Sequence, residues 1–142
     1  MSKTSPTANV ASAASCACTA RPRSPAFERA HFAVIGIGGV GSWVAEALAR
    51  SAIGKLTRID LDNVAESNTN RQIHTLDGNY GKAKVTAMAE RIKLIDPACK
   101  VMQIEDFVGP GNFDATLGAR FDRFDYVVDA IDSVRTKTAL IA

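Results

Sequence analysis

At 142 residues, the chain is long enough for one domain that buries a hydrophobic core without disulfides or metal. Its hydrophobic content of 46%, charged content of 23% and net charge of +2 are those of an ordinary globular protein, and so small a charge is no electrostatic footprint for nucleic acid. The three cysteines lack the spacing of a disulfide framework or a zinc site, so we expect free thiols in the reducing cytoplasm. No apolar run approaches the roughly 20 residues that span a bilayer.

The first 26 residues are rich in Ser, Ala, Thr and Pro and contain no acidic residue. This composition predicts a disordered tail over residues 1–26. It is also similar to an organelle transit peptide, although it lacks an amphipathic basic helix, and a misplaced start codon is a third interpretation. We therefore place the domain in residues 27–142.

A strand, a glycine loop and a helix are predicted at the start of this domain. The apolar run 32–35 is typical of a buried parallel strand, and it leads directly into the glycine loop 36–41. A helix is expected over residues 40–51, with Gly54 ending it. This order of elements is the context in which a glycine loop binds nucleotides.

The next predicted strand covers residues 56–61. Arg58 interrupts its apolar run, which predicts that one side of this strand is open. The remaining pattern predicts, in order, a loop at 63–79 with one helical turn, a helix at 82–95, a strand at 101–104, a short helix at 113–117, a strand at 126–130 and a helix from 134.

This alternation predicts an α/β fold with a doubly wound, Rossmann-like and mainly parallel sheet. The last helix runs to residue 142, whereas such a sheet normally has further strands. We therefore expect a domain that is truncated at its C-terminus, with an exposed strand edge that favours aggregation.

The glycines predict contact between the backbone and a phosphate. Gly36 allows a tight turn, Gly38 lets the backbone approach a phosphate closely, and Gly41 lets the helix pack on the strand; Gly39 lies between them. The first amide groups and the dipole of the helix would then hold the negative charge. The alternative is a glycine-rich turn without a ligand.

Two acids follow the second predicted strand. Asp60 lies about twenty residues beyond the glycines, where a carboxylate can accept hydrogen bonds from both ribose hydroxyls. Asp62 orients the following loop or is a simple turn residue.

Asn68, Arg71 and Lys84 distinguish a phosphoryl-transfer site from a dinucleotide site. Displacement at phosphorus builds charge on the equatorial oxygens, and cations placed around them stabilise it. Lys84 is expected at the start of a helix, where a cation is unfavourable unless an anion lies nearby. The alternative is that all three are solvated surface residues.

Asp132 follows the strand predicted at 126–130, at the edge where such sheets bind ligands. A carboxylate there would hold Mg²⁺ against phosphates. It is equally placed to be the N-cap of the following helix, with Ser133 as the rival. We expect Asp129 to anchor the loop.

Taken together, these motifs resemble the ThiF/MoeB/HesA family of adenylating enzymes, which are relatives of ubiquitin-activating enzyme. They are most similar to the branch that dehydrates threonylcarbamoyladenosine in tRNA. The residues that carry the resemblance are Gly36–Trp43, Asp60–Asp62, Asn68–His74, Gly81–Lys84 and Asp129–Ser133.

The resemblance implies that ATP adenylates a carboxylate, here the threonyl group of the modified tRNA, after which ring closure expels AMP. Carried over by position, Asp60 would hold the ribose. The phosphates would be held by Asn68, Arg71 and Lys84. Asp132 would hold Mg²⁺ and serve the adenylation step, and Arg71, Lys84 and Asp132 would together be the catalytic set.

The resemblance also implies a homodimer, in which an arginine-bearing segment before the first strand reaches the partner's ATP. Neither Arg21 nor Arg23 stands in a recognisable match to that segment. Relatives that adenylate the C-terminus of a ubiquitin-like sulfur carrier would use the same positions, and they imply a carrier or cysteine-desulfurase-system partner.

Two further hypotheses remain open from the residues alone. A dehydrogenase that uses NAD would need the glycine loop and Asp60, but not the cations and Asp132. A truncated domain that binds a nucleotide or a partner without catalysis would also fit the pattern.

Overall fold

The structure is a computed structural model that describes residues 23–109, 111–118 and 123–141. Most of the segment predicted as a tail lies outside these residues, as do Cys16 and Cys18. The end of that segment is ordered: helix α2 includes Pro25 and Ala26. Arg23 forms an ion pair with the buried carboxylate of Asp96. Regular structure therefore begins before the predicted boundary at residue 27.

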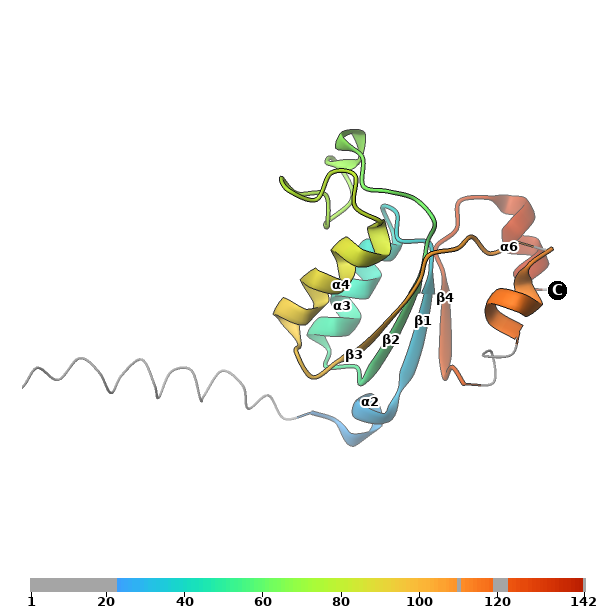
Figure 1. The fold of residues 1–142 in the computed structure, drawn as a ribbon. Coiled ribbons are helices and arrows are strands. Elements are labelled where there is room, and N and C mark those ends of the chain that lie inside the picture. Colours follow the sequence, from blue (N-terminus) through green and yellow to red (C-terminus); the bar gives the residue numbers. More distant parts are fainter. Residues whose placement is uncertain (1–22, 110, 119–122, 142) are drawn as a thin grey trace, which may run out of the picture.

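Strands and helices alternate through the described residues (Figure 1). The elements are α2 (Pro25–Arg29), β1 (His31–Ile35), α3 (Gly41–Arg50), β2 (Lys55–Ile59), the 3-10 turn η1 (Glu66–Asn68), α4 (Lys84–Ile95), β3 (Lys100–Ile104), the π-helical turn η2 (Asp114–Gly118), β4 (Tyr126–Asp129) and α6 (Val134–Ile141).

The four strands form one parallel sheet in the order β3-β2-β1-β4. The chain therefore winds outward from β1 in one direction and then crosses to its other side to form β4. This confirms the predicted doubly wound, Rossmann-like fold. In such a sheet, ligands bind at the carboxyl ends of the strands where the winding reverses, which is here the junction of β1 and β4.

Each face of the sheet is covered. Helices α3 and α4 lie together on one face, and η2 and α6 lie on the other (Figure 1). The core under α3 and α4 includes Val34, Leu56 and Met88, while Ile35, Ile59 and Leu117 pack on the opposite face. Neighbouring residues of β1 thus point to opposite faces, as the pleat of a strand requires.

Arg58 corrects one prediction, because its side of β2 is closed rather than open. The side chain is fully buried beneath α4. Its guanidinium donates hydrogen bonds to the carbonyl oxygens of Val85, at 2.6 Å, and Met102, at 3.2 Å. No carboxylate pairs with it among the described residues. Burial therefore lowers the pKa of Arg58 to about 10.

The prediction that Gly54 ends the first long helix is also wrong. Helix α3 ends at Arg50, and the left-handed residue that follows it is Ala52, with φ of 62°. Gly54 is needed for another reason. A Cβ atom at this position would lie 1.7 Å from the carbonyl oxygen of Glu28, so α2 packs directly against the backbone here.

Other boundaries differ by one or two residues from the predicted ranges. Strand β2 ends at Ile59 rather than at residue 61, and α4 begins at Lys84 rather than at residue 82. No helix among the described residues has the length and apolar character needed to cross a membrane. Cys99 is a buried free thiol, and burial raises its pKa.

Candidate nucleotide-binding site

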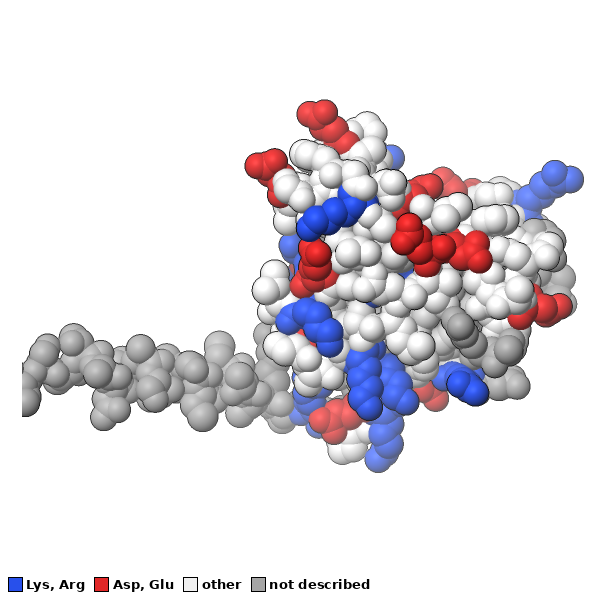
Figure 2. All heavy atoms as spheres, viewed as in Figure 1, with Lys and Arg blue, Asp and Glu red and all other residues white. Residues whose placement is uncertain are grey.

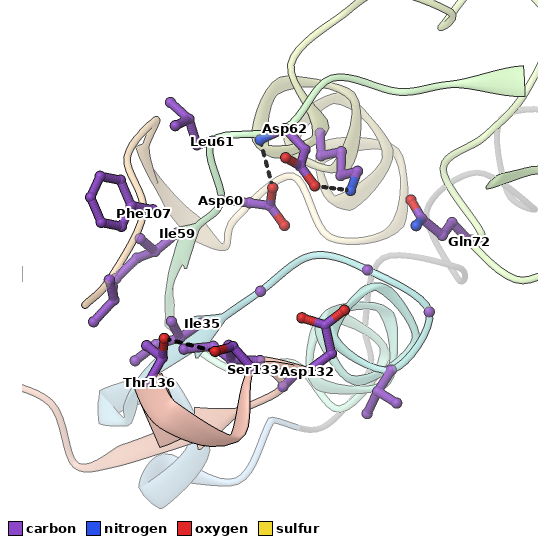
Figure 3. A pocket seen from close by; sticks show the side chains of 18 of the residues that line it. Ile35, Ile59, Asp60, Leu61, Asp62, Gln72, Phe107, Asp132, Ser133 and Thr136 are labelled. Carbon is purple, nitrogen blue, oxygen red and sulfur yellow. Dashed lines mark hydrogen bonds and ion pairs between the residues drawn. The ribbon is translucent and has the colours of Figure 1, made fainter. Parts of the chain in front are cut away.

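A pocket of about 650 Å³ opens at the carboxyl ends of the strands. It lies at the β1–β4 junction, where the winding of the sheet reverses. Of the predicted site residues, it is lined by Gly36, Gly38, Gly39, Asp60, Asn68, Arg71, Lys84 and Asp132. These residues come from five separate segments, and Figure 3 shows how several of them face a common space.

Gly41 is the predicted site residue that the lining does not include. A Cβ atom at Gly41 would lie 1.7 Å from the carbonyl oxygen of Gly36. Gly36 itself has φ of 87°, and a Cβ atom there would lie 2.8 Å from the carbonyl oxygen of Ala130. The two glycines therefore let α3, the glycine loop and the β4 loop approach one another closely. Gly41 serves packing in this arrangement, whereas Gly38 and Gly39 present backbone to the pocket.

Asp60 ties two loops of the pocket together. Its carboxylate accepts a hydrogen bond from the backbone N–H of Ile37, at 2.5 Å, and a second from the backbone N–H of Asp62, at 2.8 Å. The first bond fixes the glycine loop against the end of β2, and the second turns the chain after Asp60. Each carboxylate oxygen keeps a further lone pair for a ligand hydroxyl.

Lys84 and Asp62 form an ion pair at the pocket wall, with 2.8 Å between Nζ and Oδ2 (Figure 3). The Lys84 side chain is 7% exposed and that of Asp62 is 73% exposed. The backbone N–H of Lys84 also donates to the carbonyl oxygen of Asp62, at 2.9 Å. Lys84 is the first residue of α4, so Asp62 supplies the anion that a cation at a helix start requires.

Asn68 and Arg71 reach the pocket from the turn around η1. The side-chain oxygen of Asn68 accepts the backbone N–H of Ala65, at 3.2 Å, which closes the turn. The guanidinium of Arg71 donates to the carbonyl oxygen of Ser67, at 3.2 Å, and to the side-chain oxygen of Asn70, at 3.0 Å. Its aliphatic stem lies over Gly39, where a Cβ atom would be 3.4 Å from Cγ of Arg71.

Asp132 is exposed in the loop between β4 and α6, and its carboxylate points toward the glycine loop (Figure 3). No described residue forms a hydrogen bond or an ion pair with this carboxylate. Ser133, rather than Asp132, is the residue directly before α6, and its carbonyl oxygen accepts the N–H of Lys137 at 3.0 Å. Ser133 therefore occupies the N-cap position. Asp129 anchors the loop, as predicted, by accepting the N–H of Ile131 at 3.0 Å.

Carboxylates outnumber cations in the lining of the pocket. The lining holds the carboxylates of Asp60, Asp62, Asp106 and Asp132 but only two cations, Arg71 and Lys84. The described residues contain no cluster of three or more His, Cys, Asp or Glu side chains that would enclose a metal ion. This arrangement fits Mg²⁺, which usually takes one or two carboxylates and completes its shell with water and substrate phosphates.

Several lining residues have no predicted role. Leu61 and Phe107 are more than half exposed and form an apolar end of the pocket. No hydrophobic periodicity in the sequence predicts that these two side chains line a pocket. Gln72 also lines the pocket, although it is 5% exposed, and its side-chain oxygen is buried without a hydrogen-bond partner among the described residues. The sequence motif contained Gln72, but only the fold shows that its side chain is turned inward.

A buried histidine lies close to the pocket lysine. His74 is completely buried, and neither ring nitrogen has a partner among the described residues. Its burial, together with the positive charges of Lys84 and Arg91, lowers its pKa to about 4. His74 is therefore a neutral structural side chain at physiological pH.

The comparisons with known proteins agree with this geometry. The model of the ThiF family matches residues 20–142. The tRNA threonylcarbamoyladenosine dehydratase of Escherichia coli is 56% identical over 116 residues, which are 82% of this chain and 42% of that protein. The enzyme of the same name from Haemophilus influenzae is 54% identical over 80% of this chain and 42% of its own length.

A solved structure supports the same relationship. The E. coli dehydratase TcdA in complex with ATP has a TM-score of 0.76 and 55% identity, covering 82% of this chain and 46% of that one. A second crystal structure of TcdA contains AMP, with a TM-score of 0.75 and 56% identity over 81% of this chain and 46% of that one. The chain spans about 42% of the length of the curated dehydratases it matches. The resemblance that the sequence motifs indicated is confirmed, and the chain belongs to the ThiF family.

Proposed function

We propose that the pocket binds ATP and that the protein adenylates a carboxylate. The observation that carries this proposal is the convergence of the glycine loop, Asp60, Arg71, Lys84 and Asp132 on one pocket at the switch point of the sheet. The known complexes of a relative with ATP and AMP support it. This chain spans less than half the length of that relative.

The lining divides into two ends that suit the two ends of ATP. Leu61 and Phe107 would contact the adenine, and Asp60 lies next to them, where its free lone pairs would accept the ribose hydroxyls. The glycine-loop backbone, Asn68, Arg71 and Lys84 would hold the phosphates at the other end. Arg71 and Lys84 would stabilise the charge that develops on phosphate oxygens during displacement.

Asp132 would hold Mg²⁺ at the phosphate end. Its carboxylate is free of partners among the described residues and points toward the glycine loop, as a ligand of a phosphate-bound ion should. The ion would neutralise phosphate charge in a pocket whose carboxylates outnumber its cations. Asp129 and Ser133 position this carboxylate by fixing the loop on either side of it.

The carboxylate substrate that the relatives favour is the threonyl group of threonylcarbamoyladenosine in tRNA. An oxygen of this carboxylate would bond to the α-phosphorus of ATP and pyrophosphate would leave. Ring closure at the activated carbonyl would then release AMP. The names of the 54–56% identical relatives support this substrate over the C-terminus of a sulfur-carrier protein. A homodimer and a cytoplasmic location complete the proposal.

One departure from the family concerns the arginine that reaches the partner's ATP. Arg23 forms an ion pair with Asp96 of its own chain, at the end of α4 that is remote from the pocket. Arg21 lies outside the described residues. We therefore assign no role in ATP binding to Arg23.

The experiment is ATP–pyrophosphate exchange in the presence of tRNA that carries threonylcarbamoyladenosine. We expect exchange that depends on this tRNA and that is lost in Asp132→Ala. The matched control is Glu105→Ala, because Glu105 is an exposed acid just after β3 that does not line the pocket. Exchange that survives Asp132→Ala would refute the role of Asp132.

Binding measurements separate the other hypotheses. ATP binding without exchange would favour a non-catalytic nucleotide-binding domain, and exchange that depends on a sulfur-carrier protein instead of tRNA would change the substrate. Binding of NADH without binding of ATP would establish the dehydrogenase hypothesis.

A further inference from the structure

The amino ends of the strands, opposite the pocket, carry a row of basic side chains. We call this row, formed by Arg29, Lys55, Lys100 and Arg123, the basic edge. These residues are far apart in the sequence, and the fold brings them together. In Figure 2, Lys and Arg side chains gather at the end of the molecule that bears α2 and the amino ends of the strands.

The sheet register sets the order of this row. Lys55 and Lys100 begin neighbouring strands and are direct partners in the parallel register of β2 and β3. The N–H of Lys55 donates to the carbonyl oxygen of Ala30, at 3.1 Å, which places Arg29 next to it. On the other side, Nδ1 of His31 lies 3.0 Å from the carbonyl oxygen of Arg123, and His31 is the register partner of Lys55.

The four cations are exposed and unpaired. Their side chains form no ion pair among the described residues, and all four residues are exposed. Two exposed acids lie beside them. Asp125 accepts the backbone N–H of His31 at 2.7 Å, and Glu28 is in α2.

Like charges in register on neighbouring strands repel each other, and here no carboxylate ion pair offsets the repulsion. Two nearby cations differ, because each already has a partner within the protein. Arg23 pairs with Asp96, and the amine of Lys93 donates to the carbonyl oxygen of Cys99 at 2.6 Å. A row of unpaired cations on the rim of a sheet is suited to a polyanion.

We propose that the basic edge binds the phosphate backbone of the RNA substrate. This inference rests on the proposed function, which makes tRNA the substrate. The pocket rim is a poor surface for an RNA backbone, because carboxylates outnumber cations there and Glu105 lies just outside it. The basic edge, in contrast, offers cations without internal partners.

The dimensions agree with one RNA that reaches both ends of the sheet. Strands of four or five residues separate the basic edge from the pocket by about 13–16 Å, and the row crosses four strands, or about 14 Å. A folded tRNA is larger than both distances. The nucleoside would enter the pocket while the backbone of another part of the same molecule lies along the basic edge.

The test compares tRNA binding by the whole chain, the double variant Lys55→Gln/Lys100→Gln and the control Lys82→Gln/Arg135→Gln. The control residues lie just before α4 and on α6, away from the amino ends of the strands, and neither lines the pocket. We expect the Lys55/Lys100 variant to bind tRNA at least 10-fold more weakly near 100 mM salt. The slope of log affinity against log salt should fall by about 1 for each lysine that contacts a phosphate.

Thermal unfolding and ATP binding, measured on the same proteins, make the result interpretable. ATP binding should be unchanged in the Lys55/Lys100 variant, because neither side chain lines the pocket. The midpoint of thermal unfolding should be unchanged or higher, because neither side chain is buried and their mutual repulsion is removed. Unchanged tRNA affinity and salt slope in this variant would overturn the inference, as would an equal loss in the control. Binding of the basic edge to phosphatidylserine vesicles but not to tRNA would also overturn it.

The two proposals fail in different ways. Absence of ATP binding or exchange would refute the proposed function, yet a lysine-dependent salt slope for tRNA would still support the basic edge. If exchange takes place but the tRNA affinity is the same with and without Lys55 and Lys100, only the proposal for the basic edge is refuted.

Discussion

At the carboxyl ends of the strands, side chains are held by backbone groups around an open pocket; at the amino ends, α2 packs against the backbone and the cations project outward. The same four strands join these two edges, so the differences between the edges arise in the loops. At the pocket edge, Asp60 and the Lys84–Asp62 pair connect loops to one another. At the basic edge, Lys55 and Lys100 have no such connection. The pocket edge is thus preorganised for a ligand, whereas the basic edge presents free charge.

Glycine substitutions should have the largest effects on stability, and these effects should differ between the two edges. A Cβ atom would lie 1.7 Å from a carbonyl oxygen at Gly41 on the pocket edge and at Gly54 on the basic edge. Because Gly41 packs α3 on the glycine loop, Gly41→Ala should lower the free energy of unfolding by about 3 kcal/mol or more and abolish ATP binding. Gly54→Ala should cost about 1 kcal/mol, since α2 has no buried residue and can move away.

Urea unfolding and ATP titration would measure both effects. Gly111→Ala is the matched control, because a Cβ atom there meets nothing within 4 Å. Loss of ATP binding in Gly54→Ala with retention in Gly41→Ala would contradict the difference between the edges.

An aspartate on each edge gives the next comparison. Asp60 accepts two backbone N–H groups beside the pocket, and Asp125 accepts one, from His31, on the basic edge. Asp60→Asn turns an amide N–H toward one of these donors, and we expect the Kd for ATP to rise about 10- to 100-fold, as the loss of charged hydrogen bonds predicts. Asp125→Asn should leave the Kd unchanged. Isothermal titration calorimetry would measure the Kd for ATP of both variants. Equal increases in Kd would show that Asp60 has no special role in ATP binding.

Each edge also contains a histidine, and the two histidines should contribute differently to the pH dependence of the free energy of unfolding. The folded protein keeps His74 neutral down to about pH 4, whereas the unfolded chain binds a proton below the ordinary value of 6.5. The unfolded state therefore binds more protons in this window, and stability falls as the pH is lowered. Between pH 7 and pH 5 this contribution is about 2 kcal/mol.

His74→Gln should flatten the stability curve between pH 7 and pH 5. The half-buried His31 also has a pKa lowered by burial, so His31→Gln should flatten the curve less. Denaturant unfolding at a series of pH values measures both slopes. If His31→Gln flattened the curve more than His74→Gln does, the burial of His74 beside the pocket would be contradicted.

The smallest expected effect concerns Arg58, which lies between the two edges. Its guanidinium is buried without a carboxylate, so Arg58→Met removes a desolvated charge and should raise the free energy of unfolding by about 1 kcal/mol. Arg91→Met is the contrasting variant, because Arg91 pairs with the buried Glu46 and lowers the pKa of that carboxyl. It should destabilise the protein. Destabilisation by Arg58→Met would show that the two carbonyl contacts outweigh the cost of burial.

The order of elements and most of the site could be predicted from the sequence, because both depend on local patterns. Apolar runs and the glycine loop indicate where strands end, and parallel strands bring those ends together, so Asp60 and Asp132 could be placed at one edge of the sheet. The site roles expected of Asn68, Arg71 and Lys84 came from the family resemblance, and all five residues line the pocket. Contacts between distant segments could not be predicted. The Lys84–Asp62 pair depends on the bridge between Asn63 and Ala83, which has no sequence signal.

The same limit applies to Arg58 and to the basic edge. A single arginine in a strand indicates an open side, and only the position of α4 shows that it is covered. The overall charge of +2 gave no reason to expect a nucleic-acid surface, because the cations of the basic edge are scattered over almost a hundred residues.

The ion pair between Lys84 and Asp62 means that the pocket carries its own counter-ion. Without a nucleotide, the buried amine of Lys84 is neutralised by a carboxylate that is itself mostly in water. An arriving phosphate would exchange with Asp62, and the displaced carboxylate would be hydrated at little cost. In the proposed reaction, the same carboxylate would return when pyrophosphate leaves. Asp62 would thus lower the affinity for ATP and would also make product release easier.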